Sequence, residues 1–255
     1  MIRIKKPDEI EKMRTAGKLV ARVLADLARS IVPGQTTTGD LDELAERLIS
    51  EAGARASFKG YRGYPSSVCV SINEVVVHGI PGPRVLKPGD IVGIDLGAIV
   101  DGYHGDSAVT APVGEVSHGA KRLLRVTREA LYKGIEQARA GKRMGDLSSA
   151  IQRHVEGHGF SVVRDLVGHG IGRDMHEEPQ VANYGQPGQG ALLREGMTLA
   201  IEPMVNVGGP AIVTLEDHWT VITEDKSLSA HFEHTVAVTA HGPDILTVEA
   251  AGEAS

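Results

Sequence analysis

The sequence predicts an α+β fold made of two similar halves, in which helices cover antiparallel strands. The first observation is a repeated frame: residues 86–89 (Leu-Lys-Pro-Gly) lead to Asp95, and residues 193–196 (Leu-Arg-Glu-Gly) lead with the same spacing to Glu202. The second is that each half places two helical stretches before its strands. Helices and strands that do not alternate along the chain favour antiparallel pairing over a doubly wound parallel sheet.

The first half begins with two predicted helices. Apolar residues recur at helical spacing from residue 7 to about residue 30, and Pro33-Gly34 ends the run. A second helix is expected from Asp40 to about residue 52. Residues 68–77 then have the composition of a single strand, which the Pro-Gly-Pro sequence at 81–83 breaks.

A predicted hairpin follows, and the second half then repeats the order. Residues 91–98 and 103–110 are β-type runs joined across Asp101-Gly102, a dipeptide typical of tight hairpin turns. The entrances of the second helices also match, since Gly-Asp-Leu occurs at both 39–41 and 145–147. The second half should contain helices from 119 to about 140 and over 145–156, and strands near 162 and at 199–201, 212–222 and 232–239.

The hairpin places two acids on one face of the sheet. If Asp101-Gly102 forms a two-residue loop, Asp106 pairs with Gly97 and lies diagonal to Asp95. If the loop is centred one residue earlier, the two acids lie directly opposite each other. Both registers separate the two Cβ atoms by roughly 4.5–8 Å, and like charges that close need a positive partner.

The chain is predicted to be one domain over residues 1–255. No Gly/Ser-rich or Pro-rich linker separates the halves, which span about 8–110 and 118–239. Residues 249–255 are small and polar and are expected to fray.

Composition indicates a soluble cytoplasmic protein. Hydrophobic residues make up 41% of the chain and charged residues 24%, as in globular proteins. The net charge of −6 and the lack of basic runs argue against a nucleic-acid surface. No apolar stretch approaches the roughly 18 residues of a membrane span, and the N-terminus lacks a signal-peptide pattern. The single cysteine, Cys69, excludes an internal disulfide and fits a reducing compartment.

Five side chains of metal-binding type lie along the repeated frame: Asp95, Asp106, His169, Glu202 and Glu233. Taken singly, each has an ordinary explanation; acids near turns are often solvated, and Glu233 fits an edge strand. Together, four carboxylates in a duplicated frame and one imidazole indicate a shared site. Two divalent ions would balance the four negative charges, and oxygen-rich ligation favours such ions over structural zinc.

These residues resemble those of type I, short bacterial-type methionine aminopeptidases, which have the pita-bread fold. The resemblance covers almost the whole chain, and the family's five metal ligands fall on the five residues above. Besides the hairpin, it is carried by residues 60–65, 71–81, 168–172, 176–179 and 201–204. It implies removal of N-terminal methionine from nascent proteins with a small second residue, by a hydroxide that bridges two metal ions.

The resemblance also implies roles for residues that composition leaves open. His78 and His176 would hold the carbonyl and amide of the substrate, and Glu202 would be the acid/base. An apolar methionine pocket is implied with a wall of Tyr61, Tyr64, Cys69 and Trp219.

Two residues depart from the family's pattern. Phe58 replaces a residue that is small in many relatives, and Met175 replaces one that is commonly aromatic. Both changes bear on the shape of the pocket and leave the chemistry as it is. A monovalent cation on backbone oxygens is implied at Asn73, Val75 and Ser229.

Two other functions compete with this interpretation. Proline-specific peptidases of the same fold carry a large additional N-terminal domain, whereas this sequence starts at the first helix. A non-enzymatic pita-bread protein would have lost its metals and would bind protein or nucleic acid, but all five ligands are present. We expect a monomer that acts on nascent chains at the ribosome, without nucleic-acid or membrane binding. The metals are expected among Co, Mn, Fe, Zn and Ni, and sequence does not choose between them.

Overall fold

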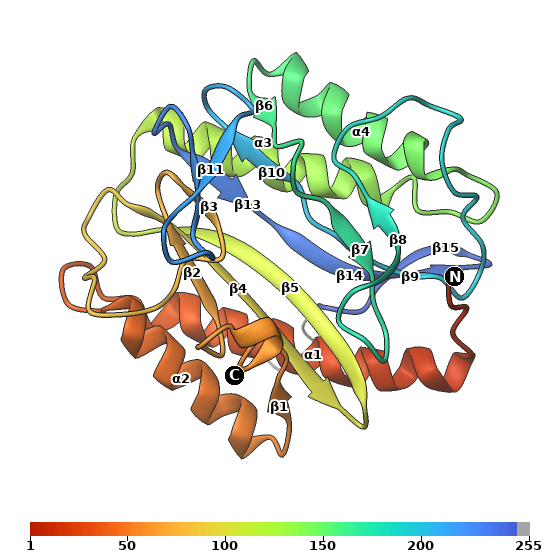
Figure 1. The fold of residues 1–255 in the computed structure, drawn as a ribbon, viewed down its shortest axis with the longest axis horizontal. Coiled ribbons are helices and arrows are strands. Elements are labelled where there is room, and N and C mark those ends of the chain that lie inside the picture. The colour runs from red at the N-terminus through yellow and green to blue at the C-terminus, as the bar shows by residue number, and fades with distance from the viewer. Residues whose placement is uncertain (249–255) are drawn as a thin grey trace.

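The computed structural model describes residues 1–248 and confirms the predicted α+β architecture. A nine-stranded sheet has the order β1-β4-β5-β14-β9-β7-β8, with β2 paired to β4 and β15 paired to β14, and two three-stranded sheets accompany it. All pairings between the described strands are antiparallel. Figure 1 shows α1 and α2 beside β4 and β5, with α3 and α4 at the opposite side of the molecule. The tail expected to fray lies outside the described residues.

In each half two long helices precede the main strands, as expected. The first half contains α1 (Pro7–Ser30), α2 (Thr38–Glu51), β1 (Arg55–Ala56), the short helix η1 (Tyr61–Gly63), β2 (Cys69–Ile72), β3 (Val75–Val77), β4 (Ile91–Val100) and β5 (Tyr103–Pro112). The second contains α3 (His118–Ile135), α4 (Met144–Gly157), β6 (Ser161–Val162), β7 (Gly168–Gly170), β8 (Glu177–Val181), β9 (Thr198–Ile201), β10 (Met204–Asn206), β11 (Ile212–Thr214), β12 (Val221–Thr223), β13 (Ser229–His231), β14 (Glu233–Thr239) and β15 (Gly242–Ile245). Among these described helices, none has the length and apolar character needed to cross a membrane.

Two strand predictions were wrong, and the helix predicted to reach about residue 140 ends at Ile135. Residues 68–77 form two strands, β2 and β3, because Asn73 adopts a φ of 57° and turns the chain between them. Residues 212–222 likewise divide into the antiparallel pair β11 and β12, with His218 at a φ of 64° in the connection. Each turn coincides with polar residues inside the β-type run, Asn73-Glu74 and Glu216-Asp217, which were the sequence signal for it.

The β4–β5 hairpin adopts the first of the two predicted registers. Asp101 and Gly102 both have positive φ, 49° and 77°, as a type I′ turn requires. Gly97 therefore pairs with Asp106, and Asp95 lies diagonal to it on the same face.

Because side chains alternate along this hairpin, one face of it packs into the core and the other face carries Asp95 and Asp106. Gly105 faces α1 so closely that an added Cβ would lie 2.7 Å from the backbone nitrogen of Gly17. The next residue, Asp106, points to the other face of the sheet. On β4, Ile94 and Leu96 belong to the apolar cluster under α1 and α2, whereas Asp95 between them faces the same side as Asp106.

The sequence repeat has structural counterparts. Thr37 bridges to Val85 in the first half, and Arg143 bridges to Leu192 in the second. The entrance of each second helix is capped in the same way, since Asp40 accepts the N–H of Thr37 and Asp146 accepts that of Arg143. Strands β5 and β14 join the halves in one sheet. The boundaries of the domain and of its halves stay predictions.

Candidate metal centre and substrate pocket

The fold gathers the five predicted metal-binding side chains from adjacent strands. Asp95 lies on β4, Asp106 on β5, Glu233 at the start of β14 and His169 in the middle of β7, while Glu202 directly follows β9. All five line one cavity. Ligand atoms of Asp106, His169 and Glu233 lie within 4.8 Å of one another, and His169 Nε2 is 3.6 Å from Glu202 Oε1.

The carboxylates are buried without enough hydrogen-bond donors. Asp95 Oδ1, Asp106 Oδ1 and Glu233 Oε1 have no hydrogen-bond partner. Burial raises the pKa of Asp106 to about 7, and burial followed by repulsion from Asp106 raises the pKa of Asp95 well above its usual range. Burial likewise raises the pKa values of Glu202 and Glu233, with smaller contributions from the neighbouring acids. Buried unpaired charge is strongly unfavourable, so this donor set fits divalent cations.

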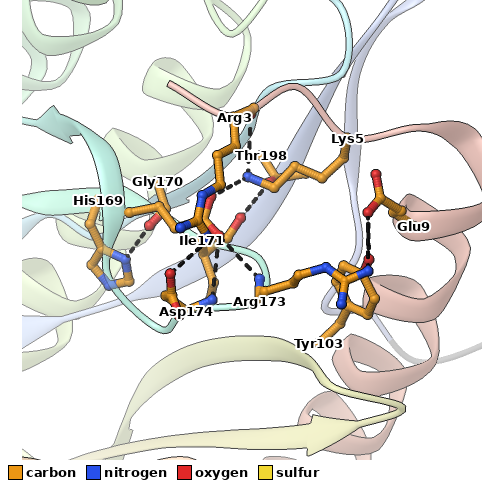
Figure 2. Close-up of polar contacts among 11 residues, drawn as sticks. Arg3, Lys5, Glu9, Tyr103, His169, Gly170, Ile171, Arg173, Asp174 and Thr198 are labelled. Carbon is orange, nitrogen blue, oxygen red and sulfur yellow. Dashed lines mark hydrogen bonds and ion pairs between the residues drawn. The ribbon is translucent and has the colours of Figure 1, made fainter. Parts of the chain in front are cut away.

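His169 has the form that a metal ligand requires. Its Nδ1 lies 2.9 Å from the carbonyl oxygen of Gly170, visible in Figure 2. A carbonyl only accepts hydrogen bonds, so Nδ1 carries the hydrogen and Nε2 carries the lone pair. Burial lowers the pKa of His169 to about 3, which keeps the ring neutral. A neutral imidazole whose second nitrogen is tied to a carbonyl is the usual arrangement of a ligating histidine.

His231 is a site residue that the sequence analysis missed. Its Nε2 lies 3.7 Å from Glu202 Oε2, and its side chain is almost completely buried. Asn183 Nδ2 also donates to the carbonyl oxygen of Glu202, at 3.0 Å. Glu202 therefore lies between two imidazoles, neither of them within hydrogen-bond distance of its carboxylate. The available signal was the spacing of two residues between His231 and Glu233, because alternate residues of an extended segment share a face.

The structure also brings together the predicted pocket residues around a cavity of about 160 Å³. They are Phe58, Tyr61, Tyr64, Cys69, His78, Met175, His176 and Trp219, and Arg62, which was not predicted, joins them. Tyr64 packs edge-on against Trp219 with 5.0 Å between ring centroids, and its hydroxyl donates to the carbonyl of Gly79 at 3.1 Å. Burial raises the pKa of the Cys69 thiol, which keeps it neutral. Apart from Arg62, the wall is thus mainly apolar, with the Tyr64 hydroxyl hydrogen-bonded and the Cys69 thiol neutral.

Two neutral histidines stand between this wall and the carboxylates. His78 has a φ of 60°, and the next residue, Gly79, passes so close to β2 that an added Cβ would lie 2.2 Å from the Val70 carbonyl oxygen. Burial lowers the pKa of His78 to about 4. His176 packs beside His169, with 4.2 Å between ring centroids, and its Nδ1 lies 2.8 Å from the Tyr61 hydroxyl. Both imidazoles can therefore hydrogen-bond a substrate without adding charge.

Two of the three residues predicted to bind a monovalent cation are in direct contact. The backbone N–H of Ser229 donates to the carbonyl oxygen of Asn73 at 2.8 Å, and Val75 begins β3 two residues after Asn73. The Asn73 side chain is held by Asp90 and by the N–H of Ile91. Cation binding here stays a prediction.

Comparison with known proteins gives consistent relatives over nearly the full chain. Methionine aminopeptidase 1 of Bacillus subtilis is 55% identical over 247 residues, which cover 97% of this chain and 99% of that protein. The methionine aminopeptidase of Escherichia coli K12 is 49% identical over 249 residues, which cover 97% and 94%. The crystal structure of methionine aminopeptidase from Thermotoga maritima superposes with a TM-score of 0.96 at 52% identity, covering 98% of this chain and all of that one.

More distant structures share the fold alone. The prolidase of Pyrococcus horikoshii has a TM-score of 0.78 at 24% identity, and the match covers 98% of this chain but 64% of the prolidase. At the level of the family, residues 11–240 match metallopeptidase family M24. The chain therefore belongs to metallopeptidase family M24.

Proposed function

We propose that this chain is a metal-dependent methionyl aminopeptidase that removes the N-terminal methionine of proteins whose second residue is small. The observation that carries the proposal is the convergence of four carboxylates, those of Asp106 and Glu233 buried, and a neutral imidazole at an aromatic-lined cavity. The proline-specific alternative is not favoured, because identity to methionine aminopeptidases is about twice the 24% identity to prolidase. The non-enzymatic alternative is not favoured either, since the complete set of carboxylates and the imidazole is present.

The proposed metal content is two divalent ions per chain, held by Asp95, Asp106, His169, Glu202 and Glu233. Membership of a metallopeptidase family supports divalent metal binding. Two ions would neutralise the four carboxylates and supply the missing partners of their buried oxygens. When bound, such ions supply Lewis acidity toward a peptide carbonyl and make water acidic enough to attack near neutral pH. Co, Mn, Fe, Zn and Ni all suit the donor set. We also infer a monovalent cation, which Asn73, Val75 and Ser229 would hold.

Other residues of the chain bind the substrate and transfer the proton. The apolar wall binds the methionine side chain, and the polarizable thioether suits aromatic neighbours such as Tyr64 and Trp219. His78 and His176 hold the carbonyl and the amide of the scissile bond, with Tyr61 orienting the His176 ring through Nδ1. A carboxylate oxygen of Glu202 accepts the proton of the attacking water and returns it to the leaving amine.

The same arrangement explains why the second residue of the substrate must be small. His78 and His176 would contact the backbone on both sides of the scissile bond, which leaves little room for the next side chain. Phe58 and Met175 line the pocket and would limit its width. The substrates are N-termini of proteins, and we infer a cytoplasmic monomer that acts on nascent chains at the ribosome.

Peptide hydrolysis with and without metal tests the proposal. The chelated protein, reloaded with Mn²⁺ or Co²⁺, is assayed on Met-Ala-Ser and on Ala-Pro peptides, with Asp106→Asn as the inactive variant. Release of methionine from Met-Ala-Ser alone, lost on chelation and absent in Asp106→Asn, is the expected result. Preferential cleavage of the Ala-Pro bond would instead support the proline-specific alternative. Metal binding without hydrolysis of either peptide would contradict both enzymatic functions.

A further inference from the structure

A second group of metal-binding side chains lies on the surface between α3 and α4, away from the cavity. Ligand atoms of Glu129, His154 and His158 lie within 4.8 Å of one another. Glu129 projects from α3, His154 lies in the last turn of α4, and His158 follows the end of that helix. All three residues are half-buried, so an ion from solvent can reach them.

The two imidazoles are arranged as a chelating pair. They are four residues apart, one in the last turn of α4 and one at its C-cap, with 4.6 Å between ring centroids. His158 Nδ1 lies 2.8 Å from the carbonyl oxygen of His154, so it carries the hydrogen and leaves the lone pair on Nε2. His154 Nε2 is 3.1 Å from Glu129 Oε2, and since an ionised carboxylate only accepts, this nitrogen carries a hydrogen that an ion bound there would displace. One ring nitrogen tied to a carbonyl is the outer support that ligating histidines commonly have.

The charges at the cluster favour binding of a cation but limit its affinity. Arg125 lies 2.8 Å from Glu129 Oε1 and, followed by His154, lowers the pKa of Glu129, so the carboxylate is ionised. The same arginine opposes a second positive charge nearby.

We propose that Glu129, His154 and His158 form an additional site for one Ni²⁺, Cu²⁺ or Zn²⁺ ion that links α4 to α3. Two imidazoles and one carboxylate prefer these ions over Mn²⁺, which the carboxylate-rich centre accepts. The site is independent of the proposed peptidase activity.

Calorimetric titration of Ni²⁺ into the Mn²⁺-loaded chain tests this site. The variants are His154→Gln and His158→Gln, with His241→Gln as a control at an exposed histidine outside the cluster. Any exchange at the catalytic centre occurs equally in all four proteins. The parent and the control should bind one more Ni²⁺ than the cluster variants, or bind it at least about tenfold more tightly, because loss of a ligand should cost no less than loss of an outer-shell partner. Equal stoichiometry and affinity in all four proteins would overturn the proposal.

A different set of contacts joins the N-terminal segment to the turn at Arg173 and Asp174 (Figure 2), which precedes His176 in the chain. Lys5 Nζ lies 2.7 Å from Glu177 Oε2, and the side chains are only 5% and 4% exposed. Arg3 Nη1 adds contacts to Glu177 Oε1 at 3.3 Å and to Asp174 Oδ2 at 2.7 Å.

Glu177 also organises the turn itself. Its Oε1 accepts the backbone N–H groups of Arg173 and Asp174, at 3.1 and 3.3 Å. At Gly172, an added Cβ would lie 2.5 Å from Lys5 Cε and 2.7 Å from Glu177 Oε1. The backbone of the turn is therefore packed directly against the ion pair, and removing either charge takes away the buried partner of the other.

We infer that Lys5 and Glu177 are positioning residues, which hold the turn so that His176 faces the metal centre. This inference rests on the proposed function of His176. Tyr61 holds the His176 ring from one side, and Glu177 holds the adjoining backbone. A displacement of about 1 Å in a positioned group can cost about 10²-fold in rate.

Kinetics combined with hydrogen exchange tests the inference. Lys5→Met and Glu177→Gln should each lower kcat about 10–100-fold with a smaller change in KM, and Lys5→Arg should restore part of kcat. Amide exchange at residues 173 and 174 should become faster in the two impaired variants. The control is Arg14→Met, which removes another ion pair of the N-terminal region, Arg14 to Asp244 at 2.7 Å.

The two readouts separate the possible failures. Unchanged exchange, or faster exchange with parental kcat, would refute the positioning role. An inactive parent would contradict the proposed function, while the exchange measurement would still report whether Lys5 and Glu177 order the turn. If Lys5→Met does not fold, Glu177→Gln with Lys5→Arg gives the same comparison.

Discussion

Asp106→Asn should stabilise the metal-free protein at neutral to alkaline pH while it abolishes activity. Asp106 is 4% exposed, and one of its carboxylate oxygens has no hydrogen-bond partner. Asparagine has almost the same shape but no charge. The substitution therefore removes buried charge without creating a cavity, and its effect on stability should depend on whether metal is bound.

The size of the effect follows from the pKa of Asp106. Burial raises it from 3.8 to about 7 in the folded chain, which corresponds to about 4 kcal/mol. Since the folded-state pKa is above the unfolded-state value, the stability contributed by the protonated group is fully present below about pH 4. It is lost as pH rises through about 7. Asp106→Asn should thus gain up to about 4 kcal/mol at pH 8 and much less at pH 5.

Urea denaturation of chelated protein at pH 5 and pH 8 measures this effect, with Asp165→Asn as an exposed control. With saturating Mn²⁺ at pH 8 the order should reverse, because ions that bind only the folded parent stabilise it by mass action. If chelated Asp106→Asn is no more stable than the parent at pH 8, charge burial does not destabilise the metal-free site. If metal stabilises both proteins equally, Asp106 is not a ligand.

Three further outcomes are expected. His78→Asn should lower kcat about 10²-fold or more. Its denaturation midpoint should stay near that of the parent, because asparagine tolerates the φ of 60° at this position. A parental kcat would mean that His78 has only a structural role. Hydrolysis of Met-Gly, Met-Ala and Met-Ser peptides should far exceed that of Met-Leu and Met-Lys, and Phe58→Cys should accelerate bulkier methionine analogues more than methionine; equal rates, or an unchanged analogue ratio, would contradict the assigned pocket. Gly79→Ala should lower the unfolding free energy by about 1–3 kcal/mol, as overpacking does, because its Cβ would lie 2.2 Å from the Val70 carbonyl oxygen; an unchanged urea midpoint would mean that β2 yields there.

The sequence by itself determined the α+β class, the main helices and the five candidate ligands. Local rules were sufficient for the helix α1, whose apolar period and terminal signals predicted both ends. They also reduced the hairpin to two registers, both with Asp95 and Asp106 on one face. The duplicated frame singled out Glu202 and Glu233 because it placed acid on acid twice, a pattern that one surface residue does not produce.

Only the tertiary structure decided the surroundings of these residues. Glu233, which fits an edge strand in the sequence, lies on β14 between β5 and β9, and this burial raises its pKa. His231 meets Glu202 from a different strand, and Lys5 meets Glu177 across 172 residues of chain. Such contacts depend on strand order and on the left-handed turns that redirect short strands. The periodicity of the sequence predicts on which face of a helix or strand a residue lies. The tertiary packing determines which other residues that face contacts.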